Sequence, residues 1–143
     1  MEIMTKVLIN APVSKVWGIL MRFDNYDQWN PFIKDVSGKL MNGEKIRVRF
    51  KLSGVREIGI NSKVIVYRPE RELRWKKKIL MRWIFTSVHI FELKQEQDGN
   101  TAFSQRGRYK GILYSLFFKR YAHKAKEGFE LMNLKLKELA ETY

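Results

Sequence analysis

A histidine in an apolar segment is the side chain best suited to chemistry in this sequence. His89 lies within residues 83–96, and an imidazole can donate, accept or transfer a proton near neutral pH. Gln105 and Tyr109 alternate with basic residues in the segment 101–110. If the two segments pair as strands, these three side chains form a small polar cluster among apolar ones, as in many small-molecule sites. A core histidine satisfied by a neighbour is the favoured alternative, and catalysis by His89 is a weak candidate.

The residue sets of common catalytic and metal sites do not occur. The sequence has no cysteine and two histidines, which disfavours a zinc site and rules out disulfides and cysteine nucleophiles. It contains no glycine-rich phosphate loop, nucleophile elbow or dinucleotide fingerprint. We therefore expect no metal and no cofactor, and favour a binding protein over an enzyme.

Composition indicates one domain with a substantial core. The chain has 143 residues, 45% hydrophobic and 13% aromatic, which suits a single domain over 1–143. It shows neither a signal-peptide pattern nor an apolar run long enough to span a bilayer, so we expect a soluble cytoplasmic protein. The net charge of +13 favours contact with anionic membranes or nucleic acid, but a generally lysine-rich composition explains it equally well.

Periodicity predicts a strand, two short helices, six strands and one long helix. Pro12 suits the first position of a helix over 13–21. Asp24 can cap a second short helix that contains Trp29 and ends at Pro31. Two-residue alternation and the turns Asn42-Gly43 and Asp98-Gly99 indicate antiparallel strands. The predicted strands cover 3–9, 32–40, 45–52, 56–67, 73–76, 83–96 and 101–110.

A long amphipathic helix is expected after Gly111. Apolar residues recur there at steps of three and four over about thirty residues, and a helix of that length can cross a small domain. It is the one element able to cover the concave face of a curved sheet. The predicted fold class is α+β, a seven-stranded antiparallel sheet wrapped around this helix. The expected inner helix face comprises Phe117, Tyr121, Ala125, Gly128, Met132, Leu136, Leu139 and Tyr143.

Strand alternation, together with the inner face of the long helix, selects the side chains expected to line a cavity between sheet and helix. Gly107 and Gly128 could make room there for a ligand, or for close packing against a large ring such as Trp17, and packing is favoured. The expected lining comprises Trp29, Trp75, Trp83, Phe85, His89, Phe91, Phe103, Gln105, Tyr109, Phe117, Tyr121 and Met132.

Two surface features leave alternatives open. Outward strand positions are rich in Lys and Arg, which predicts either a solvated charged face or contact with anionic headgroups. Nucleic acid is disfavoured because no aromatic residues interleave with these basic ones. The apolar stretch 79–85 could be a cavity rim touching membrane, a homodimer contact or a central strand. His123 is expected at the surface.

Several short phrases occur in order along the chain: Ala11-Pro12 with Val16-Trp17, Trp29-Asn30-Pro31-Phe32-Ile33, Arg71-Glu72-Leu73-Arg74-Trp75, His89-Ile90-Phe91-Glu92-Leu93, and Met132-Asn133 with Leu136-Lys137. Together with the order of elements, they resemble the SRPBCC superfamily, which includes the birch-pollen allergen, START lipid-transfer domains and proteins of the polyketide cyclase/dehydrase type. The resemblance implies a helix-grip fold with a cavity, but no particular reaction. Relatives often carry an acidic residue near the position of Gly107, so its absence here weakens a catalytic interpretation.

The favoured hypothesis is a carrier, sensor or sequestering protein for a hydrophobic small molecule, lipid-like or polycyclic. An enzyme of the cyclase or dehydratase type, with His89 as acid/base and Gln105 or Tyr109 polarising a carbonyl, is the first alternative. Binding of an anionic membrane or nucleic acid through the basic convex face is the second.

Overall fold

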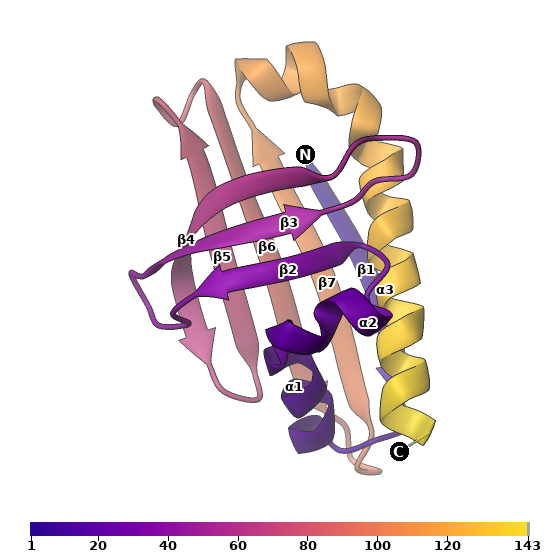
Figure 1. Ribbon diagram of the computed structural model, residues 1–143. Coiled ribbons are helices and arrows are strands. Elements are labelled where there is room, and N and C mark those ends of the chain that lie inside the picture. The colour runs from indigo at the N-terminus through magenta and orange to yellow at the C-terminus, as the bar shows by residue number, and fades with distance from the viewer. Residues whose placement is uncertain (143) are drawn as a thin grey trace.

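Seven strands form one antiparallel sheet in the computed structural model, which describes residues 1–142 (Figure 1). The spatial order is β1-β7-β6-β5-β4-β3-β2, so each strand from β2 to β7 pairs with its neighbour in sequence, and β1 closes the edge beside β7. The predicted seven-stranded antiparallel sheet is confirmed. The strands are β1 (Glu2–Ile9), β2 (Ile33–Gly38), β3 (Lys45–Phe50), β4 (Ile58–Arg68), β5 (Glu72–Ile79), β6 (Phe85–Gln95) and β7 (Thr101–Lys110).

The helices lie before β2 and after β7. The predicted helix over 13–21 is confirmed as α1 (Val13–Met21). The expected cap at Asp24 is wrong, because Asp24 lies inside a 3-10 turn and Asn25, which precedes α2, makes no side-chain capping hydrogen bond. The remaining helical elements are η1 (Phe23–Asn25), α2 (Tyr26–Trp29), the π-helical η2 (Tyr114–Phe118), the 3-10 helix η3 (Lys119–Tyr121) and α3 (Ala122–Thr142).

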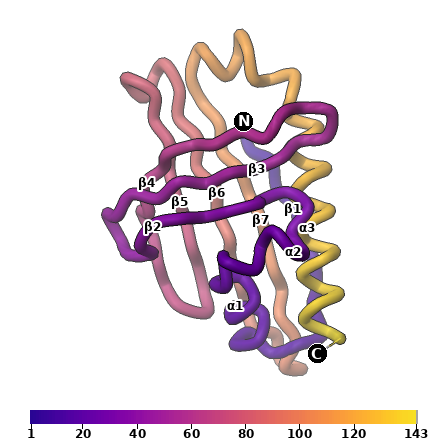
Figure 2. The backbone as a smooth tube through the Cα atoms, viewed as in Figure 1, coloured from indigo at the N-terminus to yellow at the C-terminus, as the bar shows by residue number. Residues whose placement is uncertain are grey.

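The sheet curls so that β2 and β3 cross in front of β5, β6 and β7 (Figure 1). The register of β4 against β5 shifts between Val64 and Val66, and such a bulge bends a strand and increases its twist. A second shift lies in β2 between Ile33 and Asp35. The concave face formed in this way encloses the core, and α3 runs along it (Figure 2).

The long helix is shorter and less regular than its periodicity predicts. Regular α-helix covers 21 residues from Ala122, whereas the preceding turns are π-helical and 3-10. The predicted face is therefore right for Gly128, Met132 and Leu136, which are buried, but wrong for Phe117, which is 54% exposed. Tyr143 lies outside the described residues.

The close approach of α3 to β2 depends on Gly128. A Cβ atom at this position would lie 2.5 Å from Cδ1 of Phe32. Asn30 positions Phe32 through a turn in which its Oδ1 accepts the N–H groups of Phe32 and Ile33, both at 2.9 Å. Gly128 therefore makes room for packing, as favoured from the sequence, although the ring is Phe32 and not Trp17.

Candidate functional site

A cavity of about 590 Å³ lies between the curled strands and the start of α3. Its volume falls within the range of about 300–1,000 Å³ typical of small-molecule sites. Aromatic rings from several parts of the chain form its wall, including those of Phe32, Phe50, Trp75, Phe85 and Tyr121. Two further hollows on the outer side of the sheet are lined largely by charged and exposed residues such as Lys6 and Lys94, so the aromatic cavity is the better candidate for an apolar ligand.

Strand register arranges the inner face of the sheet in rows. Partnered residues of β5, β6 and β7 share one face because side chains alternate along each strand. From the open end inward, the rows are Ile79–Phe85, then Lys77–Ser87–Tyr109, then Trp75–His89–Gly107, then Leu73–Phe91–Gln105.

His89 lies among aromatic rings, with part of its own ring on the cavity wall. Its imidazole stacks on the indole of Trp75, with centroids 4.9 Å apart and planes inclined by 10°. Phe91 and Phe129 present ring edges at 5.0 and 5.1 Å. Its Nε2 atom lies 2.9 Å from Oε1 of Gln105. The imidazole is thus enclosed by aromatic rings, and both His89 and Trp75 line the cavity.

A chain of hydrogen bonds determines which ring nitrogen of His89 carries the proton. Thr5 Oγ1 donates to the backbone oxygen of Gln105 at 3.0 Å, and Asn133 Nδ2 donates to Thr5 Oγ1 at 2.8 Å. Gln105 Nε2 donates to Asn133 Oδ1 at 2.9 Å, so Oε1 of Gln105 is left as an acceptor. His89 must donate to it from Nε2, and Nδ1 is then the unprotonated nitrogen.

Thr5 and Asn133 were not among the site residues predicted from the sequence. The available signal was an asparagine on the buried face of the long helix, next to Met132 and four residues after Phe129. A buried polar side chain requires partners, and β1 supplies one only after it has returned to the edge beside β7.

Burial lowers the pKa of His89 from its ordinary value of 6.5 to about 4, and the hydrogen bond to Gln105 opposes part of this shift. The ring is therefore neutral at pH 7. Burial also raises the pKa of Tyr109, and the neighbouring Tyr114 adds to the rise. The two phenol rings stack at 5.6 Å. A Cβ atom at Gly107 would lie 2.5 Å from the Tyr109 hydroxyl, so the space beside Gly107 is filled by Tyr109.

The predicted lining residues fall into three groups. Trp75, Phe85, His89, Tyr109 and Tyr121 lie on the cavity wall, and their contact with a ligand stays a prediction. The fully buried side chains form the core beyond the wall. These are Phe91, Phe103, Gln105 and Met132.

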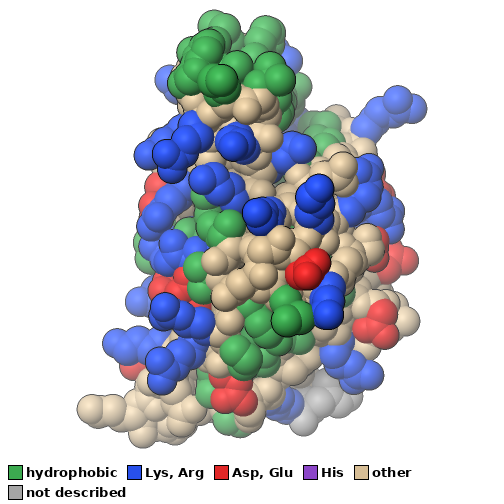
Figure 3. Space-filling model, turned by 90° about the vertical axis from the view of Figure 1, so that its left-hand side faces the viewer, with side chains coloured by type: hydrophobic (Ala, Val, Ile, Leu, Met, Phe, Trp, Pro, Cys, Tyr) green, Lys and Arg blue, Asp and Glu red, His purple; other side chains and the backbone are tan. Residues whose placement is uncertain are grey.

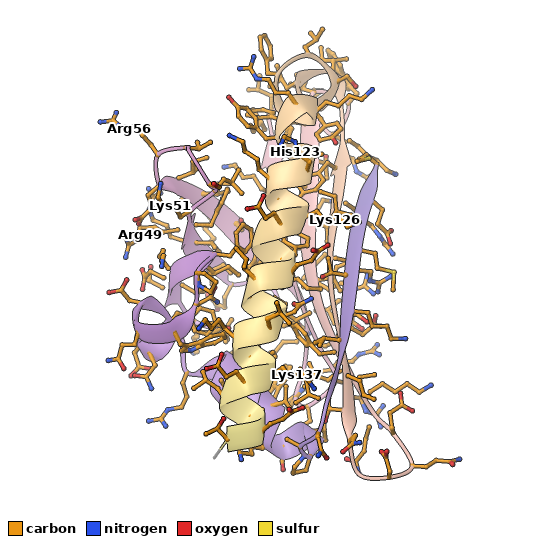
Figure 4. The ribbon with its side chains drawn as sticks, turned by 90° about the vertical axis from the view of Figure 1, so that its right-hand side faces the viewer. Arg49, Lys51, Arg56, His123, Lys126 and Lys137 are labelled. Carbon is orange, nitrogen blue, oxygen red and sulfur yellow. The ribbon has the colours of Figure 1, made fainter. Side chains whose placement is uncertain are left out.

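The third group does not reach the cavity. Trp83, expected inward, is 62% exposed, because β6 begins only at Phe85 and Trp83 belongs to the turn before it. Phe117 is exposed because the segment before α3 is not regular helix. Trp29 is half-buried against Tyr26, with centroids 5.2 Å apart. His123 is at the surface of α3, as expected (Figure 4).

The sequence profile of the family described as "Polyketide cyclase / dehydrase and lipid transport" matches residues 1–141. The chain belongs to this family. No match was found among curated proteins.

Solved structures share the fold of this family member at low sequence identity. Protein MLL2253 from Mesorhizobium loti has a TM-score of 0.73 and 18% identity, over 97% of this chain and 96% of the other. Major latex-like protein 151 from Panax ginseng has a TM-score of 0.75 and 7% identity, over 98% and 97%. The di-domain ARO/CYC StfQ of the steffimycin biosynthetic pathway has a TM-score of 0.71 and 11% identity, over 98% of this chain and 50% of the other. The helix-grip fold expected from the resemblance is confirmed.

Several polar groups on the cavity wall of this family member were not foreseen, among them Arg47, Asn61 and Ser62. Lys77 lies on the inner face of β5 and lines the cavity, and no acidic side chain of residues 1–142 forms an ion pair with it. The buried hydroxyl of Tyr114 has no hydrogen-bond partner in the same part of the chain. Extending the alternation of Leu73 and Trp75 by one step would have placed Lys77 inward, but the run Lys76-Lys77-Lys78 concealed it.

The basic outer face is partly neutralised by ion pairs. Arg106 lies 2.6 Å from Glu92, and Arg108 lies 2.9 Å from Glu2. Arg49 pairs with Glu57, and Arg74 pairs with Glu72. Paired surface charges attract an anionic partner less than unpaired ones.

No helix within residues 1–142 is long and apolar enough to cross a membrane. The cytoplasmic location stays a prediction. Within the same residues, no three side chains of the His, Cys, Asp or Glu types are grouped to hold a metal ion.

Proposed function

We propose that this protein binds a lipid-like carboxylate in the cavity and carries or sequesters it. One observation carries the proposal: Lys77, which has no ion-pair partner among residues 1–142, lies in a wall that is mostly aromatic and aliphatic. The other cation of this wall, Arg47, donates a hydrogen bond to Asn61. Family membership supports binding of a hydrophobic small molecule. The charge of Lys77 narrows the ligand to a molecule with an anionic end.

The position of Lys77 suggests how such a ligand lies. Its row contains Ser87 and Tyr109, and Tyr109 stacks on Tyr114. Hydroxyl donors next to an ammonium group suit a carboxylate. Beyond this row the wall continues through apolar rings and through Ala122 and Ala125 of α3, which leaves space for an alkyl chain.

The geometry does not favour an acid/base role for His89. Its single ring proton is donated to Gln105, and its low pKa makes the neutral form a weak base. A general acid/base works best with a pKa near the working pH. As neutral rings on the cavity wall, His89 and Trp75 are better suited to contact with an apolar ligand.

The proposal is tested by displacement of a neutral fluorescent probe, 1-aminoanthracene, with dodecanoate and with dodecanol. We expect dodecanoate to bind at least about tenfold more tightly, which corresponds to about 1.4 kcal/mol. Lys77→Met should lose this preference and still bind dodecanol, whereas Lys76→Met, on the outer face of the same strand, should keep it.

A second pair of variants tests the cavity itself. Ala125→Trp should fill the cavity and abolish binding of probe and ligands, whereas the neighbouring exposed change Lys126→Trp should not. Equal binding of acid and alcohol would contradict the carboxylate assignment. Probe binding that Ala125→Trp leaves intact, or no binding at all, would contradict the cavity as the binding site.

A further inference from the structure

Large hydrophobic side chains are exposed together at one end of the molecule, beside the cavity (Figure 3). They come from the β5–β6 turn and from the segment between β7 and α3. Leu80 is 80% exposed and Leu116 is 70% exposed. Contiguous exposed apolar surface usually marks a contact with another molecule. We call this surface the apolar tip; it comprises Leu80, Met81, Trp83, Ile112, Leu116, Phe117 and Phe118.

We propose that the apolar tip docks onto an anionic lipid bilayer by inserting into its headgroup region. This proposal does not depend on the identity of the cavity ligand. Four features support it: the tip is rigid, positive charge surrounds it, the backbone at Leu80 is strained, and the tip borders the cavity.

The two segments of the tip are held together by the backbone. Ile112 N–H donates to the Trp83 oxygen at 3.1 Å, and Leu113 N–H donates to the Ile84 oxygen at 3.0 Å. Gly111 permits this approach, because its φ is +108° and a Cβ atom there would lie 2.4 Å from the Ile84 oxygen. The exposed side chains therefore share a fixed platform instead of lying on two independent loops.

Unpaired positive charge borders the tip. Register places Lys78 and Lys110 at the ends of β5 and β7, one step from the apolar end. The segments 73–91 and 99–126 contain no Asp or Glu. The bordering cations form no ion pair with any residue from 1 to 142, unlike the arginines of the outer face. They comprise Lys78, Arg82, Lys110, Lys119 and Arg120.

The positive charge around the tip favours an anionic bilayer over a second copy of the chain as the partner. Basic side chains beside an exposed apolar surface are typical of segments that lie in the interface of anionic membranes. Two copies of this chain joined tip to tip would bring ten unpaired cations together, which disfavours a homodimer through the same surface. An anionic bilayer offers complementary charge and an apolar layer for Trp83, a residue type enriched at membrane interfaces.

Leu80 occupies a backbone conformation that leucine rarely adopts. Its φ is +58°, in the left-handed region that favours glycine and asparagine. The side chain makes little contact within the molecule, since 80% of it is exposed. The strain is therefore not offset by packing in the isolated protein, but is consistent with a contact made outside it.

The tip also borders the cavity. Phe118 belongs to the tip and to the cavity wall, and its ring packs against Phe85 at 5.3 Å. Ile79 and Tyr114 lie on the wall nearby. Docking through the tip would thus place this end of the cavity against the bilayer, where an apolar ligand could pass without crossing water.

The test uses the full chain with vesicles of phosphatidylcholine alone and of equimolar phosphatidylcholine and phosphatidylglycerol. We expect sedimentation with the mixed vesicles only, weakened by salt, and a blue shift of tryptophan emission. Trp83 is the reporter, because Trp17 and Trp75 are buried and Trp29 is half-buried in α2, which is not part of the tip. Trp83→Phe should remove the shift but keep most of the sedimentation.

Matched variants distinguish binding through the apolar tip from non-specific hydrophobic adsorption to vesicles. The double change Leu80→Asn with Leu116→Ser should weaken vesicle binding at least tenfold. The matched change Leu131→Ser with Leu134→Ser removes two exposed leucines of α3 and should have no effect. Arg82→Gln with Lys119→Gln, which removes two of the five bordering cations, should weaken the dependence on phosphatidylglycerol.

Three results would overturn the proposal. One is absence of binding to the mixed vesicles, and another is equal binding by the tip variants and the α3 variants. The third is concentration-dependent self-association that the tip variants abolish, which would assign the surface to a second copy of the chain.

Discussion

The imidazole of His89 lies flat against the indole of Trp75, with centroids 4.9 Å apart. The stacking partner covers one side of the ring, and the single N–H is directed to Gln105. A second proton would have to be placed on Nδ1, which lacks a hydrogen-bonding partner among residues 1–142. This arrangement makes the fold sensitive to acid at one identifiable residue.

Stability should fall as pH decreases from about 6.5 to about 4. In this window the unfolded chain takes up a proton at His89 and the folded chain does not, so the free energy of unfolding rises with pH. The pKa of about 4 corresponds to at most about 3 kcal/mol, fully present above pH 6.5. Urea unfolding at a series of pH values measures it. His89→Gln should flatten the dependence in this window, and His123→Gln should leave it unchanged; the reverse pattern would contradict the assignment.

Gly128→Ala should destabilise the protein by about 1–3 kcal/mol. The added Cβ would lie 2.5 Å from the Phe32 ring, and overpacking of this kind outweighs the better helix propensity of alanine. Gly18→Ala is the matched control in α1, where nothing lies within 4 Å of the new Cβ. It should stabilise by about 0.5–1 kcal/mol. Urea midpoints that move in the same direction for both would contradict the packing account.

Asn133→Leu should cost about 2–4 kcal/mol, because in a buried environment it removes the main acceptor of the Gln105 amide and the donor to the Thr5 hydroxyl. Thermal or urea unfolding measures the loss. Thr5→Val removes the next group in the chain, so the double variant should be less destabilised than the two single changes added together. Strict additivity would show that the hydrogen bonds do not act as a network.

Leu80→Asn should raise the stability of the isolated protein by about 1 kcal/mol, because asparagine tolerates the left-handed backbone at this position. Leu116→Asn, at an exposed position of the π-helical segment where φ is not positive, should bring no gain. The comparison by urea unfolding is independent of any membrane. A loss of stability with Leu80→Asn would mean that the leucine side chain supports the turn.

Local sequence patterns were sufficient to predict much of the fold. The period-two segments, Asn42-Gly43 and Asp98-Gly99, and the order of elements predict a curved antiparallel sheet with a helix on it, because alternation and turn propensity are properties of neighbouring residues. Trp75 and His89 were placed on the inner face by the same alternation. The pattern was misleading at Trp83 and Phe117, where an apolar residue was taken as buried although the strand or helix had ended.

The inner and outer faces of the strands, the short first helix and the covering helix follow from the chain's own periodicity. The pairing of Thr5 with Asn133, the fit of Phe32 against Gly128 and the joining of the β5–β6 turn to residues 111–113 do not. Each depends on atoms that strand pairing and the curl of the sheet bring together from distant parts of the chain. Side-chain periodicity is a local property, whereas register, cavity shape and the apolar tip arise only when the sheet has curled.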